Sequence, residues 1–269
     1  MNVFFLELRN LRKSAFISTL SIGGVIFALL AFFPSMQTEA MRTLAGAKME
    51  GIDPSLLAAL GLSVLMDFSI ITNFFGYVLQ YITLAMMVII TQQAVRLLIK
   101  EETDGTIEYL FARPISRTEI SVQKGLAHFA LFLFMNAVWG FVTVIGYLLF
   151  SDYALGAAIK EAVIFFSAIL FVGLVFSAVG LLVSSLLKRG KSTAGITIAI
   201  VFGTFLLGMM SVTVSGLGFL IWFSPMDWIK SDKLMHKGIL WQEWLVGIGV
   251  IVCTTMAAWL QYRRKDLLV

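Results

Sequence analysis

The sequence predicts an all-α, polytopic membrane protein, built as a single domain over residues 1–269 with six transmembrane helices. Three observations support this class. The chain is 59% hydrophobic and 13% charged, with a mean hydropathy of +0.92, which lies far outside the range of soluble domains. Its apolar residues form runs long enough to cross about 30 Å of hydrocarbon. Lys and Arg gather in every second connection between these runs, as they do in loops on the inner side of a membrane.

The first apolar run, 14–33, follows three basic residues, Arg9, Arg12 and Lys13. Because this run is longer than the apolar core of a cleaved signal peptide, we interpret it as an uncleaved first span. Residues 1–13 place apolar side chains on one helical face and charged side chains on the other. This pattern predicts a short N-terminal helix lying in the inner membrane interface.

The second span is predicted over 73–95, after an outer segment, 34–72. The stretch 55–71 within that segment has a short apolar core, and we interpret it as an amphipathic or re-entrant helix on the outer side. Counting it as a further span would move the charged loop 96–124 to the outside. With six spans, the inner segments hold 14 of the 20 Lys and Arg residues. This bias predicts a multi-pass protein of the cell membrane with both termini in the cytoplasm.

The later spans are predicted over 125–150, 161–187, 193–215 and 243–262. The fifth apolar run continues past residue 215, so Gly216, Gly218 and Pro225 predict a break and a short helix within the outer segment 216–242. Small residues at helical spacing predict faces where helices touch, either within the bundle or at a dimer seam or substrate path. They are Ser14, Ser18, Ser21 and Ala28 in the first span, Gly173, Ser177, Gly180 and Ser184 in the fourth, and Gly195, Ala199 and Gly203 in the fifth.

Several kinds of site are disfavoured. Gly190-Lys191-Ser192-Thr193 resembles the end of a phosphate-binding loop, but Ser185 stands where that motif requires Gly. With one cysteine and two distant histidines, neither a metal site nor a catalytic site is expected. No span carries a charged residue near its centre, which disfavours an ion-coupled carrier. The net charge of +4 is too small and too dispersed to predict nucleic-acid binding.

The loop 96–124 is the most polar part of the chain. Glu101, Glu102 and Asp104 favour the N-terminus of a helix, and Pro114 ends that helix. Ser116-Arg-Thr-Glu119 then has the spacing of a capping box that opens the next helix. The loop is therefore expected to be helix–Pro–helix, held close to the membrane. A solvated turn capped by acids is an equal alternative on these grounds.

The same loop resembles the connection between the second and third spans of type-2 ABC-transporter permeases. That family typically shows an acidic stretch, Gly-Thr-hydrophobic-Glu, an apolar run, Pro and Arg, followed by a Lys. The corresponding residues here run from Glu101 to Ile120, with Lys124 downstream. The ending Tyr262-Arg-Arg-Lys-Asp-Leu267 is similar to the family's aromatic-basic-Asp-Leu ending. The layout covers the whole chain, whereas the specific residues cover a small part of it.

This resemblance implies an exporter permease whose loop is a cytoplasmic coupling helix. The implied partners are two separate ABC-type ATPase subunits and a second permease, either a homodimer copy or a related chain. ATP and Mg would be used by the ATPase, and this chain would bind no cofactor. Carried over by position, the ATPase contact falls on Glu101, Glu102, Asp104, Gly105, Thr106, Glu108, Tyr109, Pro114 and Arg117.

The substrate path is expected along scattered polar residues of the spans, although each of them also suits an interhelical hydrogen bond. An amphipathic or hydrophobic cargo fits such a path, for example a peptide antibiotic, a drug or a lipid-like molecule. Two alternative functions are an ATP-independent channel or secondary carrier, and a non-transporting scaffold or immunity component. The path residues are Gln80, Thr83, Asn136, Thr143, Thr197 and Thr204.

Overall fold

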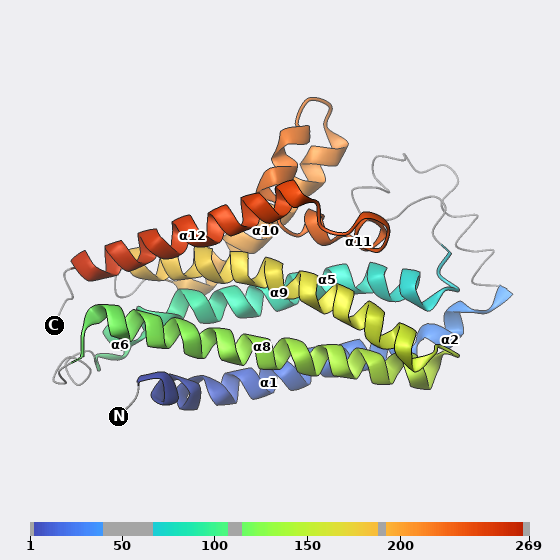
Figure 1. The fold of residues 1–269 in the computed structure, drawn as a ribbon, viewed down its shortest axis with the longest axis horizontal. Coiled ribbons are helices and arrows are strands. Elements are labelled where there is room, and N and C mark those ends of the chain that lie inside the picture. Colours follow the sequence, from blue (N-terminus) through green and yellow to red (C-terminus); the bar gives the residue numbers. More distant parts are fainter. Residues whose placement is uncertain (1–2, 40–66, 107–114, 188–191, 266–269) are drawn as a thin grey trace.

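The computed structural model describes residues 3–39, 67–106, 115–187 and 192–265, and the regular elements in these ranges are all helices. Six of the described helices are long and apolar enough to cross a membrane, which confirms the expected number of spans. Figure 1 shows that the start of α1, the end of α12 and the short helix α6 lie at the same end of the bundle, called here the α6 end. The six helices are α1 (Val3–Ala31), α5 (Ile71–Leu97), α8 (Arg117–Phe150), α9 (Leu155–Leu186), α10 (Thr193–Thr213) and α12 (Trp241–Arg264).

Helix α9 forms the centre of the bundle, because 67% of its most apolar stretch is buried. It packs against α5, α8 and α12, while α1 packs against α8 on one side of the molecule and α10 against α5 on the other (Figure 1). The predicted small-residue face of the fourth span is confirmed, since it is buried throughout. A Cβ atom on Gly173 would lie 2.2 Å from Cζ of Phe132, and one on Gly180 would lie 2.8 Å from Cβ of Ala94. These glycines let α8 and α5 approach α9 closely.

The small-residue face expected in the first span does not pack within this protomer, so the interpretation as a contact inside the bundle is wrong; the alternative, a dimer seam or substrate path, stays a prediction. Ser14, Ser21 and Ala28 are exposed, and α1 instead buries Ile22, Gly23, Ile26 and other residues against the bundle. The physical reason is that α8 supplies the small residue of this contact. A Cβ atom on Gly146 would lie 2.4 Å from Cδ1 of Leu30, so α1 contributes the large side chain that fills the gap.

Several boundaries differ from the expected ones. The N-terminal helix expected over 1–13 forms the first turns of α1, which continues unbroken from Val3 to Ala31 and is about 43 Å long. The break after the fifth span is confirmed. Helix α10 ends at Thr213, Gly216 has a φ of +92°, and a 3₁₀ helix, η1 (Gly218–Phe223), follows. Most of the helix expected over 55–71 lies outside the described residues.

The end of the bundle opposite α6 contains a buried carboxylate that was not expected. Glu161, in the second turn of α9, accepts a hydrogen bond from Oγ1 of Thr72 at 2.8 Å and another from the hydroxyl of Tyr153. Two effects raise the pKa of the Tyr153 phenol: burial is the larger, and the hydrogen bond to Glu161 is the next. These bonds join the start of α5 to α9 and to the α8–α9 link.

Two glycines of α12 provide a test of the packing between α9 and α12. A Cβ atom on Gly247 would lie 2.3 Å from Cζ of Phe171, whose ring centroid is 4.1 Å from that of Trp244, whereas a Cβ atom on Gly249 meets nothing within 4 Å. Gly247→Val should therefore lower the free energy of unfolding by about 1–3 kcal/mol through overpacking. Gly249→Val, the matched control, should change it by less than about 0.5 kcal/mol. Denaturant titration in mild detergent measures both values, and equal losses would contradict the α9–α12 contact.

Candidate functional site

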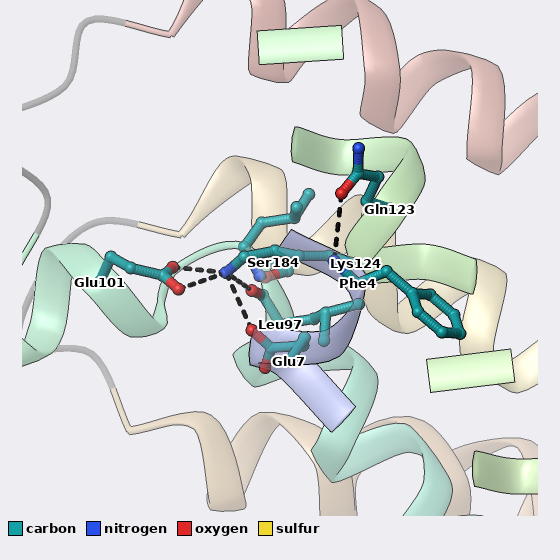
Figure 2. A network of polar contacts seen from close by, with 8 residues as sticks. Phe4, Glu7, Leu97, Glu101, Gln123, Lys124 and Ser184 are labelled. Atoms are coloured by element: carbon teal, nitrogen blue, oxygen red, sulfur yellow. Dashed lines mark hydrogen bonds and ion pairs between the residues drawn. The ribbon is translucent and has the colours of Figure 1, made fainter. Parts of the chain in front are cut away.

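The described part of the charged loop is organised around the amine of Lys124. This residue lies in the second turn of α8, and its side chain is 1% exposed. Its Nζ donates to both carboxylate oxygens of Glu101 at 2.5 Å and to the carbonyl oxygen of Leu97 at 2.7 Å. It also lies 3.7 Å from Oε2 of Glu7, which is equally buried. Figure 2 shows these groups converging from α1, the end of α5, α6 (Lys100–Asp104) and α8.

This arrangement compensates the burial of an ammonium group. An unpaired charge in such a place is costly unless carboxylates and hydrogen-bond acceptors surround it. Leu97 is the last residue of α5, and the carbonyl groups at a helix C-terminus lack partners within the helix. Lys124 therefore satisfies a helix end and the Glu101 carboxylate together, and its amine lies close to the buried Glu7 carboxylate. It thereby fixes the spacing between α5, α6 and α8.

A second set of polar contacts joins α6 to the end of the chain. Nζ of Lys265 lies 2.7 Å from Oε1 of Glu102 and donates to the carbonyl oxygen of Leu187 at 2.7 Å. Arg117 donates through Nη1 to the carbonyl oxygen of Lys265 at 2.6 Å. The two sets together form what we call the α6 junction, and its side chains are Glu7, Glu101, Glu102, Arg117, Lys124 and Lys265.

A small apolar cluster lies next to the α6 junction. Val3, Leu98, Ile120 and Tyr262 form a small buried cluster contributed by α1, the α5–α6 link, α8 and α12. The backbone N–H of Leu98 also donates to Oγ of Ser184 at 2.9 Å. Since water is excluded from this cluster, the ion pairs beside it are stronger than they would be on an open surface.

Both ends of the undescribed part of the loop have defined local structure. Helix α6 ends at Gly105, whose φ of +68° favours glycine, and the N–H of Thr106 donates to the carbonyl oxygen of Glu101 at 2.9 Å. Oγ of Ser116 accepts a hydrogen bond from the N–H of Glu119 at 3.2 Å. The Glu119 carboxylate accepts from Nε2 of Gln123 at 2.9 Å. The Ser116 half of the expected capping box is therefore present.

The loop residues singled out by the sequence fall into three groups. Glu101, Glu102 and Arg117 belong to the α6 junction and contact other parts of this chain. Asp104, Gly105 and Thr106 are exposed to solvent. The remaining three, Glu108, Tyr109 and Pro114, lie outside the described residues.

Most of the polar residues expected along a substrate path form hydrogen bonds within one helix or between two helices. Two of them join helices: Asn136 donates to the carbonyl oxygen of Phe166 at 2.9 Å, and Thr197 donates to Oε1 of Gln92 at 2.7 Å. The hydroxyls of Thr83, Thr143 and Thr204 donate to backbone carbonyls of the preceding turn in their own helices. Gln80 is half-buried on α5.

Sequence reasoning missed Glu7 and Lys265 as members of the α6 junction. Glu7 stands one helical turn after Val3 and one turn before Leu11, but Asn10 and Ser14 on the same side of the helix leave no clear apolar stripe that would single it out. Lys124 does have such a signal, since Ile120 and Ala127 flank it on one face of α8 and both are buried. A charged residue within an apolar helical stripe indicates a buried partner.

Comparison with known proteins agrees with this architecture. Residues 1–267 match the family described as ABC-2 family transporter protein. None of the curated proteins matches the sequence. The family match spans nearly the whole chain, including all six described membrane-length helices and the α6 junction. This chain therefore belongs to the ABC-2 family of transporter proteins.

Proposed function

We propose that this chain is the permease subunit of an ATP-binding-cassette exporter, with α6 and the loop after it docking on a separate ATPase subunit in the cytoplasm. The α6 junction is the observation that carries the proposal. A loop that merely connects two spans needs no buried ion pairs, whereas a loop that transmits force needs a rigid attachment to the helices it moves. Lys124 and Lys265 provide that attachment through Glu101 and Glu102.

The exposed residues after α6 form the side that faces the partner. Glu101 and Glu102 are turned toward their lysines, so they shape the docking surface and leave its direct contacts to exposed groups. Asp104, Gly105 and Thr106 are exposed where the described part of the loop ends. The proposed ATPase contact therefore includes Asp104, Gly105 and Thr106. The expected contacts at Glu108, Tyr109 and Pro114, which lie outside the described residues, remain part of the proposal.

The exporter also requires a second permease, and α10 is the helix suited to meet it. Gly195 and Ala199, from the small-residue face predicted in the fifth span, are exposed on this protomer beside Ile198 and Phe202. Close helix contacts in lipid use such small residues. The hydrogen bond from Thr197 to Gln92 holds α10 against α5, so a pair of subunits meeting along α10 would bring both α5 helices near the seam. Both homodimer and heterodimer fit this arrangement.

The proposed cycle is a shift between two conformations driven by nucleotide on the ATPase subunits. ATP and Mg, bound by those subunits, would close them and draw the two α6 junctions together. Because α6 is fixed to α1, α8 and the C-terminal end of α9, these helices would move as a unit and open the seam outward. The cargo is an amphipathic or hydrophobic molecule, which suits a seam lined mainly by apolar side chains.

The first prediction concerns docking. Asp104→Arg reverses one exposed charge and should weaken co-purification of the ATPase by about tenfold or more, which equals 1.4 kcal/mol. Asp152→Arg, an exposed aspartate in the α8–α9 link at the opposite end, is the matched control and should retain the ATPase. The measurement is ATPase stoichiometry and ATP-dependent turnover after purification from native membranes. Full retention in the Asp104 variant would count against the assigned docking surface.

The second prediction concerns rigidity. Lys124→Met leaves Glu7 buried and unpaired, so it should lower the free energy of unfolding by about 3–5 kcal/mol. In the double variant Lys124→Met/Glu101→Gln, the free energy of unfolding should fall by less than the sum of the two single effects. The difference should be about 0.5–3 kcal/mol, because the two side chains interact directly. Exposed Arg9→Ala serves as the control, with a change below about 0.5 kcal/mol. Additive losses in this double-mutant cycle would show that the pair is not coupled.

A further inference from the structure

An apolar groove is lined by residues of α1 and α8, the two helices that lie across the bundle from α10 (Figure 1). Its volume is about 610 Å³, within the range of sites that hold small ligands. Phe16 and Phe27 of α1 and Phe134 of α8 form its rims, and all three side chains are exposed. The groove is therefore open to the surrounding lipid along its length.

Two adjacent glycines create the hollow, and tight helix packing keeps it open. A Cβ atom on Gly24 would meet nothing within 4 Å, and one on Gly23 would lie 3.8 Å from Cγ2 of Val142. Beneath them, Nε1 of the buried Trp139 donates to the carbonyl oxygen of Thr19 at 3.2 Å. The groove is thus a fixed feature of a close helix pair, present without a ligand.

One charged residue, Arg12, lines the groove at its α6 end. Arg12 is exposed, and within the described residues it forms no salt bridge. Its neighbours Arg9 and Lys13 are also exposed, while the acid of this segment, Glu7, is buried beside Lys124. The mouth of the groove therefore presents positive charge next to an apolar channel.

We propose that this groove binds one anionic phospholipid, with an acyl chain along Gly23 and Gly24 and the phosphate on Arg12. The dimensions agree, since Arg12 and Phe27 are about 22 Å apart along the helix and one leaflet contributes about 15 Å of hydrocarbon plus its headgroup layer. The planar guanidinium of arginine binds phosphate through paired hydrogen bonds. The lipid is a resident one, because α1 and α8 lie across the bundle from the proposed α10 seam (Figure 1); this assignment and its placement in the cytoplasmic leaflet rest on the proposed function.

Native mass spectrometry of the purified full chain tests this site, using phosphatidylglycerol and phosphatidylcholine with identical acyl chains. Wild type should retain one phosphatidylglycerol per protomer, with phosphatidylcholine at least about tenfold weaker. Gly24→Leu should lose both lipids because the side chain fills the groove. Ser21→Leu, which places the same side chain at an exposed position outside the groove, should behave as wild type.

The charge is tested separately. Arg12→Gln should lose the preference for phosphatidylglycerol and keep weak retention of both lipids, whereas Lys13→Gln, a neighbour outside the groove lining, should keep the preference. Equal retention of the two lipids by wild type, or unchanged retention in both the Gly24 and Arg12 variants, would overturn the proposal. If Gly24→Leu fails to elute as a folded species, the comparison of Arg12→Gln with Lys13→Gln is sufficient to test the proposal. The assay needs neither ATP nor a partner, so its failure leaves the proposed ATPase docking intact.

Discussion

The burial of the Lys124 amine is the constraint on which the rest of the structure depends. An ammonium group with 1% exposure cannot leave its partners without a large desolvation penalty, so Glu101, Glu7 and the end of α5 must stay where they are. Lys265 applies the same constraint to Glu102 and to the end of α9. Helix α6 is therefore an integral part of the bundle, although it has only five residues and would not be stable alone.

The two sides of the bundle serve different contacts. The α10 side exposes small and apolar residues on a helix joined to α5 by the Gln92–Thr197 hydrogen bond, which suits a second permease. The α1–α8 side has a groove lined by apolar residues and by Arg12, which suits a lipid of the bilayer. Helix α9 lies between them and is joined to α5 at both ends, through Glu161 to Thr72 and through Ser184 to Leu98. Movement at the α6 junction would thus reach both sides through one rigid core.

The spans were predictable because the hydropathy and the length of an apolar run can be read from consecutive residues. The break at Gly216 was predictable because glycine readily adopts the positive φ found there. The packing faces were only partly predictable, since a small residue makes a contact only where the partner helix offers a large one. Gly173 meets Phe132, but in the first span the small partner, Gly146, belongs to α8. Glu101, Glu102 and Arg117 of the α6 junction were singled out from the sequence, but their pairing was not predictable, because it depends on how distant helices pack. Glu7 and Lys124 are far apart in the chain, and only the folded bundle shows which acid pairs with which lysine.

The central claim is that the exposed end of α6 touches an ATPase subunit while the α6 junction holds it to the spans. Site-specific photo-crosslinking in native membranes tests this contact most directly, with a photoreactive amino acid placed at Thr106 or, as a control, at Asp152 in the opposite link. The account predicts one crosslinked product from the Thr106 position that contains an ATP-binding-cassette subunit, and none from the Asp152 position. An absence of that product from Thr106, or its formation from Asp152 alone, would contradict the account.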